Sequence, residues 1–358
     1  MKRQYTFLLF IIFSFIPLPF LSGIFNKSQG GFSAIWDGIS FQIVYISAIL
    51  LFIMTFVRTK KSSKDFFIYK LIWLQEMFII SGLSGTIIGF VLTLNAMEME
   101  NLEYDPMATL IASLAISMIT IVYGFMGAVT VYIIQKYNEM SIDKKTDNIV
   151  EKPKEGFLLS SLIYFLIVGI FTFLSIAIGS EGAGGIKVLA SSEGLIYIVT
   201  ILIIFIFFYK GNSIINLIKN LFWYIPDQEN NIEYNLKFIR DMKKILAMII
   251  SVSFLCAPIV MLLALSMPEE KNIFGWNSNI FIGLKNGGLQ FMWVLYFIFL
   301  LNIIEGREVS KLYFETGKIS AGDRFYSIKY ILAPSFLLFF HIFFWHNDLI
   351  HTLIIMNL

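Results

Sequence analysis

The sequence predicts an all-α, polytopic membrane protein with about nine transmembrane helices. Of the 358 residues, 57% are hydrophobic and only 15% are charged, whereas a soluble domain carries roughly 25% charge. The mean hydropathy is +0.76. The apolar residues also fall in blocks of about 20, the length that a helix needs to cross a hydrocarbon core about 30 Å thick.

Apolar runs with few charges place the expected spans along the chain. They lie at about 6–25, 39–58, 71–96, 107–135, 157–179, 193–210, 243–266, 287–305 and 326–346. The first run follows a basic start, Met1-Lys2-Arg3, as a secretory signal does. Because no small-residue cleavage site follows it, we expect this run to be retained as a span.

The short loops predict the orientation, because Lys and Arg accumulate on the cytoplasmic side of a membrane. Basic residues gather in the segments after the second, fourth, sixth and eighth spans. The loop between the third and fourth spans is acidic, with Glu98, Glu100, Glu103 and Asp105. We therefore expect the N-terminus in the cytoplasm and the C-terminus outside.

Composition and motifs exclude several kinds of site. A net charge of +2 gives no basic surface for nucleic acid, and a single cysteine, Cys256, gives no disulfide framework. The three histidines, His341, His346 and His351, do not share a helix face as metal ligands should. Because no nucleophile with its base and no phosphate loop stands out, we expect neither enzyme activity nor a metal or other cofactor.

The third and fourth spans each carry a stripe of small and hydroxyl residues. Residues three and four apart share a helix face. On the third span this face holds Gly82, Gly85, Thr86, Gly89 and Thr93. On the fourth span it holds Ser113, Ser117, Thr120, Gly124, Gly127 and Ala128.

Two interpretations of the stripes remain open. The small residues can serve helix packing alone, since they let transmembrane backbones approach each other. Alternatively, the hydroxyls line a wet passage or face a partner helix, because a hydroxyl gains nothing at a lipid-facing position.

These residues carry a resemblance to a known family. The segments GLSGTIIG at 82–89 and ATLIASLAISMITIVYGFMGA at 108–128 resemble the paired signature of the MotA/TolQ/ExbB proton-channel family. The resemblance covers about 71–137 and implies a four-helix membrane unit at 1–145. It further implies an ion-driven stator or energy-transducing subunit in a bacterial inner membrane.

The resemblance also implies partners and site residues. Five copies would surround two single-span proteins of the MotB/TolR/ExbD kind, whose membrane Asp takes up H⁺ or Na⁺. Thr86, Thr93, Ser113, Ser117 and Thr120 would line the ion path, with the five glycines of the stripes packing the ring. Ile121 stands where MotA-like members have a second Thr.

The chain departs from the family after the third and fourth spans. Five further spans at 146–358 have no assigned role, and the short segment before the third span makes a flagellar stator unexpected. The alternative is a permease-like carrier whose substrate site lies at broken helices, with Gly182–Gly185 as one such interruption.

Charged residues at the ends of two spans complete the candidates. Glu76, near the cytoplasmic end of the third span, is either a carboxylate at the inner mouth of a channel or a solvated helix start. Glu305, Arg307 and Glu308 close the eighth span. We expect them to be interfacial charges whose spacing allows local pairing.

Overall fold

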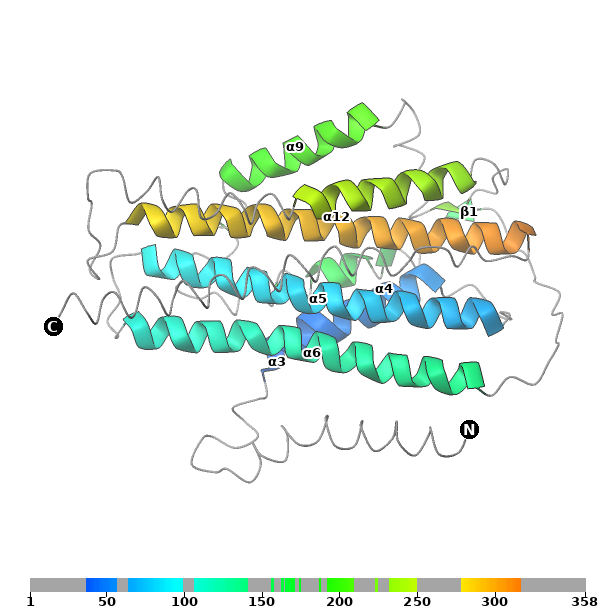
Figure 1. The fold of residues 1–358 in the computed structure, drawn as a ribbon, viewed down its shortest axis with the longest axis horizontal. Coiled ribbons are helices and arrows are strands. Elements are labelled where there is room, and N and C mark those ends of the chain that lie inside the picture. Colours follow the sequence, from blue (N-terminus) through cyan, green and yellow to red (C-terminus); the bar gives the residue numbers. More distant parts are fainter. Residues whose placement is uncertain are drawn as a thin grey trace, which may run out of the picture.

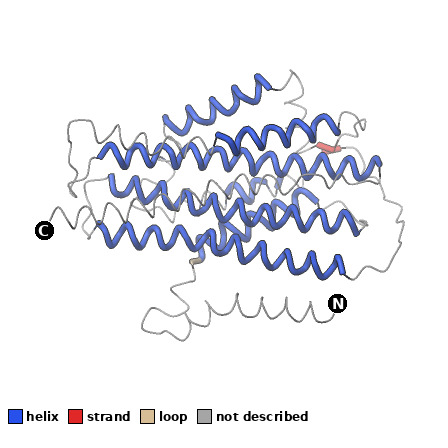
Figure 2. Tube along the Cα trace, viewed as in Figure 1, coloured by secondary structure: helices blue, strands red, loops and turns tan. Residues whose placement is uncertain are grey.

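The architecture of the chain, taken from a computed structural model, is a bundle of long helices that run along one axis (Figures 1 and 2). The structure describes residues 37–56, 64–98, 106–140, 156–157, 162–163, 165–170, 174, 187, 192–208, 223–224, 232–249 and 278–316. The strands within these ranges are β1 (Gly156–Phe157) and β2 (Trp223–Tyr224), which form one short antiparallel pair. The predicted helical class is therefore confirmed for the described residues.

Helix α5 (Lys64–Glu98) lies between two long partners. It forms an antiparallel hairpin with α6 (Pro106–Met140) and also runs antiparallel to α12 (Ser278–Thr316) (Figure 1). Apolar side chains surround α5, as expected for a helix that protein encloses rather than lipid. At 1.5 Å per residue these helices are roughly 50–60 Å long, so they extend beyond a hydrocarbon core of about 30 Å.

A shorter rod covers the hairpin near its middle. It consists of α3 (Gly38–Phe41), the π-helical η3 (Gln42–Ile46) and α4 (Ser47–Phe56). Asp37 caps its start, because the Asp37 carboxylate accepts a hydrogen bond of 2.8 Å from the backbone N–H of Ser40. Tyr45 packs against Phe78 of α5, with ring centroids 5.1 Å apart. The rod thus packs against both helices of the hairpin, α5 and α6.

Four described helices are long and apolar enough to cross a membrane: Gly38–Phe56, Asp65–Asn95, Ile119–Asn138 and Lys285–Thr316. They overlap the predicted spans at 39–58, 71–96, 107–135 and 287–305, although the third begins later and the fourth ends later than predicted. Helix α9 (Ser192–Phe208) coincides with the predicted span at 193–210.

The other predicted spans fall largely outside the described residues. The runs at 6–25 and 326–346 lie wholly outside them, 157–179 is described only in short pieces, and 243–266 only as far as residue 249. The count of nine spans and the cytoplasmic N-terminus stay predictions.

Glycines set the distance between α5 and its neighbours. A Cβ on Gly82 would lie 2.9 Å from the Thr120 carbonyl oxygen, and one on Gly124 would lie 2.7 Å from the Phe78 carbonyl oxygen. On the other side of α5, a Cβ on Gly288 of α12 would lie 2.7 Å from Val91 Cγ2. The two neighbours therefore pack directly against the α5 backbone or its short side chains.

We expect Gly124→Ala to destabilise the bundle, because its new methyl group meets backbone atoms that cannot rotate away. Overpacking of this kind costs about 1–3 kcal/mol. Gly287→Ala is the matched control, since no atom of the described residues lies within 4 Å of its added Cβ and alanine gains up to about 1 kcal/mol of helix propensity. Denaturant unfolding in lipid nanodiscs measures both, and equal stabilities would contradict the close approach.

Candidate functional site

Two polar sites lie on different faces of α5. The first is the pair formed by Thr86 and Thr120, which belong to the facing stripes of α5 and α6. Gly85 and Gly89 lie beside it, and a Cβ on these glycines would lie 3.0 Å from Thr120 Cβ and 2.5 Å from Ser117 Cβ, respectively. The predicted small faces therefore pack against each other within one chain.

The hydroxyl oxygens of Thr86 and Thr120 are 2.7 Å apart. Thr120 is also placed to donate to the Ser117 carbonyl oxygen at 2.7 Å, and Thr86 to the Gly82 carbonyl oxygen at 3.0 Å. The Thr86 side chain is only 1% exposed and the Thr120 side chain only 3%. In this arrangement the pair is a hydrogen-bonded contact between helices, so the packing interpretation accounts for it without an open passage.

The other predicted lining residues are arranged differently. Thr93 donates to the Gly89 carbonyl oxygen of its own helix at 2.8 Å, and Ser117 is buried against Gly89. Ser113 is part of α6, but its side chain lies outside the described residues. The structure therefore brings Thr86, Thr120 and Ser117 together. The Thr93 hydroxyl instead bonds to the backbone of its own helix.

A second polar contact closes the same interface at the other end of the hairpin. The Gln75 amide nitrogen of α5 donates to the Gln135 amide oxygen of α6 at 2.5 Å, and both side chains are buried. Phe78 lies one turn further along α5, and a Cβ on Gly127 would lie 2.5 Å from its ring.

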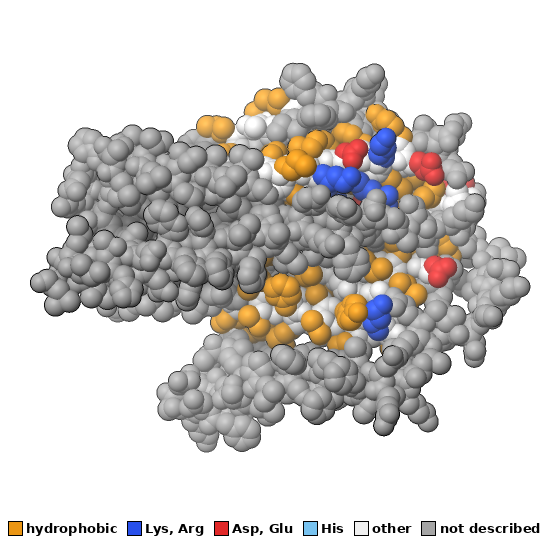
Figure 3. Space-filling model, in the orientation of Figure 1, with side chains coloured by type: hydrophobic (Ala, Val, Ile, Leu, Met, Phe, Trp, Pro, Cys, Tyr) orange, Lys and Arg blue, Asp and Glu red, His pale blue; other side chains and the backbone are white. Residues whose placement is uncertain are grey.

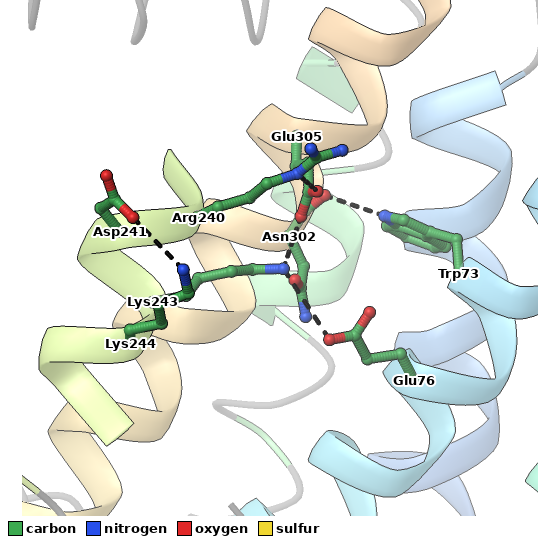
Figure 4. A network of polar contacts seen from close by, with 8 residues as sticks. All are labelled: Trp73, Glu76, Arg240, Asp241, Lys243, Lys244, Asn302 and Glu305. Carbon is green, nitrogen blue, oxygen red and sulfur yellow. Dashed lines mark hydrogen bonds and ion pairs between the residues drawn. The ribbon is translucent and has the colours of Figure 1, made fainter. Parts of the chain in front are cut away.

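The second site is a charge cluster on the α12 side of α5, made of Glu76, Arg240, Lys243 and Glu305 (Figure 4). Lys243 Nζ lies 2.5 Å from Glu305 Oε2 and 3.8 Å from Glu76 Oε1. Arg240 Nε lies 3.2 Å from Glu305 Oε1. Two carboxylates and two basic groups thus meet where α5, α12 and the helix at 232–249 come together.

The helix at 232–249 is amphipathic, and its pattern explains why Lys243 points inward. Buried residues recur every three or four positions at Ile232, Leu236, Ile239 and Leu246, and Lys243 falls on the same stripe. The adjacent Lys244 instead pairs with Asp241 at 3.4 Å on the exposed side. One helix therefore carries one buried and one exposed lysine in succession.

Further polar contacts hold α12 beside the cluster. Trp73 Nε1 donates to the Asn302 carbonyl oxygen at 2.8 Å. Lys311 Nζ lies 3.1 Å from Glu308 Oε1, and Asn235 Nδ2 donates to Glu308 Oε2 at 3.1 Å. Figure 3 shows a few acidic and basic side chains set among hydrophobic ones on the described part of one face.

The expectation of local pairing is wrong for Glu305, whereas Glu308 does pair locally, with Lys311 three residues further along α12. The interfacial position of these charges stays a prediction. Glu305 is 3% exposed and Glu308 is fully buried, because α12 continues as a helix to Thr316 and other helices cover this stretch. Glu305 pairs with residues about 60 positions away in the chain. Arg307 donates to the Met54 carbonyl oxygen of α4.

The interpretation of Glu76 as a solvated helix start is also wrong. Helix α5 begins well before it, at Lys64, and Glu76 is 3% exposed. Its role at an inner mouth stays a prediction.

The cluster marks one boundary of an apolar interval. From Glu76 to Asn95 on α5, and from Glu305 to Lys285 on α12, the distance along the helix is about 30 Å. Lys285 Nζ lies 3.5 Å from Asn95 Oδ1 at the far end. This length is close to that of the hydrocarbon core of a bilayer. We therefore expect the cluster at one boundary of the membrane, and the predicted orientation would put it on the cytoplasmic side.

Sequence reasoning missed Arg240, Lys243 and Asn302 as site residues. The two basic residues were used only to orient the chain, since they lie in a basic segment. A lysine on the apolar stripe of an amphipathic helix is the signal that could have identified Lys243. No comparable sequence signal distinguishes Asn302.

We expect Lys243→Met to be strongly destabilising, because it leaves the buried Glu305 carboxylate without its closest partner. Removal of one member of a buried ion pair costs about 3–5 kcal/mol. Lys244→Met is the matched control: its side chain is 45% exposed, and such changes shift stability by about 0.5 kcal/mol or less. Unfolding in nanodiscs compares the two, and a second change, Glu305→Gln, should restore part of the loss in the Lys243→Met chain.

No protein-family model, curated protein or solved structure matches the chain. The resemblance carried by 82–89 and 108–128 therefore rests on those residues alone and is taken up below as a proposal.

Proposed function

We propose that this chain is a ring-forming subunit of an ion-driven motor or energy-transducing complex in a bacterial inner membrane. It conducts H⁺ or Na⁺ together with single-span partners of the MotB/TolR/ExbD kind, which supply a membrane Asp. A homopentamer around two such partners is the proposed assembly. The MotA/TolQ/ExbB-like signature on α5 and α6 supports this proposal.

The observation that carries the proposal is the Thr86–Thr120 pair. Its two hydroxyls come from different helices, lie 2.7 Å apart and fall within an apolar interval of bilayer length. A hydroxyl within a membrane is useful where an ion must exchange its hydration shell for protein oxygens. The described parts of α5 and α6 carry no Asp or Glu between Glu76 and Glu98 on α5 or between Pro106 and Gln135 on α6, so the ion-binding carboxylate is proposed to come from the partner.

Burial of the pair sets a condition on this mechanism. Because Thr86 and Thr120 are enclosed by their own chain, an ion reaches them only when α5 and α6 separate locally or when a partner helix displaces a covering segment. The rod at Gly38–Phe56 is the neighbour to displace, since Ile43 Cγ2 would lie 3.3 Å from a Cβ on Gly85. We propose that partner binding moves this rod.

We expect Thr86→Val and Thr120→Val to abolish ion flux while the protein still folds. Valine keeps the shape of threonine but removes the hydroxyl, whereas Thr86→Ser keeps it and should conduct. The measurement is ion uptake into proteoliposomes that contain the chain and its copurified partner, at matched protein content.

Thr130→Val is the matched control for this experiment. Thr130 is an exposed residue of α6 whose hydroxyl donates to the Met126 carbonyl oxygen of its own helix. Its variant should conduct like the unchanged chain. Normal flux through both Thr86→Val and Thr120→Val would exclude the ion-path role of the pair.

The alternative function is a permease-like carrier, and the charge cluster favours it. Ionisable residues buried between membrane helices commonly mark a substrate or ion pathway. Glu76, Lys243 and Glu305 lie on the α12 side of α5, away from the hairpin interface that resembles the channel family. The proposed broken helix at Gly182–Gly185 lies outside the described residues.

Subunit stoichiometry distinguishes the two functions. The ring proposal predicts about five copies of this chain with a smaller number of single-span proteins in native mass measurement, and no flux from the chain alone. A carrier predicts a monomer or dimer that transports without a partner. Isolation of a transport-competent monomer would therefore replace the first proposal by the second.

A further inference from the structure

The contact between Lys243 and Glu76 is too long for a direct hydrogen bond. Lys243 Nζ lies 2.5 Å from Glu305 Oε2 but 3.8 Å from Glu76 Oε1, whereas N–H···O bonds normally span 2.7–3.2 Å. At this distance the two groups form an ion pair, and a water molecule beside them can hydrogen-bond to both.

The side-chain amide of Asn302 is a second, independent observation. Its Oδ1 and Nδ2 are both buried, and neither has a hydrogen-bond partner among the described residues. Buried amide groups are almost always paired with protein or with ordered water. An amide with both polar atoms unpaired therefore indicates a polar ligand beside it.

The register of α5 against α12 places this amide at the level of Glu76. A Cβ on Gly306 would lie 2.9 Å from Trp73 Nε1, and one on Gly288 would lie 2.7 Å from Val91 Cγ2. In this antiparallel register Glu76 falls opposite Ile303, the residue after Asn302. Figure 4 shows the Asn302 side chain directed into the space between Lys243 and Glu76.

We propose that this space is a water-binding site, occupied by at least one water molecule that bridges Lys243, Glu76 and Asn302. The water accepts a hydrogen bond from the Lys243 ammonium group and donates to the Glu76 carboxylate. Water also donates a hydrogen bond to Oδ1 of Asn302 and accepts one from its Nδ2. Buried waters typically make two to four hydrogen bonds of this kind.

Water fits the site better than an ion does. Asn302 presents a donor and an acceptor, and water can serve both, whereas a cation serves only the oxygen and an anion only the nitrogen. The two carboxylates and two basic groups of the cluster already balance in charge, so a bound ion would leave a buried net charge.

The site lies close to solvent on the side of the helix at 232–249. Arg240, which pairs with Glu305, has a side chain that is 23% exposed, and the next residue, Asp241, lies on the exposed surface. A water molecule in the site can therefore exchange with solvent by passing the Arg240 side chain. The site is on the opposite side of α5 from the Thr86–Thr120 pair, and it requires neither a ring nor a partner protein.

Radiolytic hydroxyl-radical footprinting of the full chain in nanodiscs tests this site, with water itself as the probe. Radicals formed at a bound water oxidise the side chains beside it, even where bulk solvent has no access. Met77 follows Glu76 and lies at the level of Asn302, while Met292 lies deep in the apolar interval, and both are fully buried. We expect Met77 to be oxidised several-fold faster than Met292.

Asn302→Leu removes the amide and fills its space, so it should lower the oxidation of Met77 to the rate of Met292. Ser310→Ala is the control, because Ser310 is a buried α12 residue whose hydroxyl donates to the Gly306 carbonyl oxygen of its own helix. It should leave the oxidation of Met77 unchanged. Equal oxidation of Met77 and Met292 in the unchanged chain would overturn the proposal, as would a fast rate that Asn302→Leu does not alter.

Discussion

The direct contact of the α5 and α6 backbones is the constraint on which the rest of the structure depends. Gly82 and Gly124 approach so closely that a Cβ on either would lie 3.0 Å from the other's Cα. This distance brings the hydroxyls of Thr86 and Thr120 within hydrogen-bond reach, and it presents a smooth joint surface that the rod at Gly38–Phe56 covers. Association without a hydrophobic driving force between helices relies on such close packing and on interhelical hydrogen bonds.

The second constraint is that α5, enclosed by protein, must provide partners for the amide, carboxylate and hydroxyl groups of Gln75, Glu76 and Thr86. On the α6 side Gln75 and Thr86 do so with uncharged partners at the same level of the facing helix. On the α12 side Glu76 is a charge, and the chain provides a buried lysine from a third helix for it and for Glu305. A buried unpaired charge would cost far more free energy than a buried unpaired hydroxyl. The charged face of α5 therefore needs partners from two other helices, α12 and the helix at 232–249.

Local patterns predicted the elements and one interface, but not how distant helices meet. The three- and four-residue spacing of the small residues placed Gly82, Gly85 and Thr86 on one face of α5 and Thr120 and Gly124 on one face of α6. The structure adds that these two faces meet within one chain. Glu305 was misread as a locally paired charge because the end of an apolar run was taken as the end of the packed helix. Its partners are Arg240 and Lys243, and no periodicity within one helix reveals a contact with another helix so far along the chain.

The two polar sites share one helix, and this has a mechanical consequence. Helix α5 packs along its length against α6 through glycines and against α12 through Gly288, Gly306 and an ion-paired boundary. Packed helices do not deform continuously, so a displacement of α5 must be taken up at one of these interfaces. The glycine contacts with α6 tolerate sliding without loss of a charge partner, whereas sliding against α12 would separate Glu76 and Glu305 from Lys243 at a high electrostatic cost. We therefore expect the electrostatic cost of a displacement to be lower at the hairpin interface than at the α12 interface.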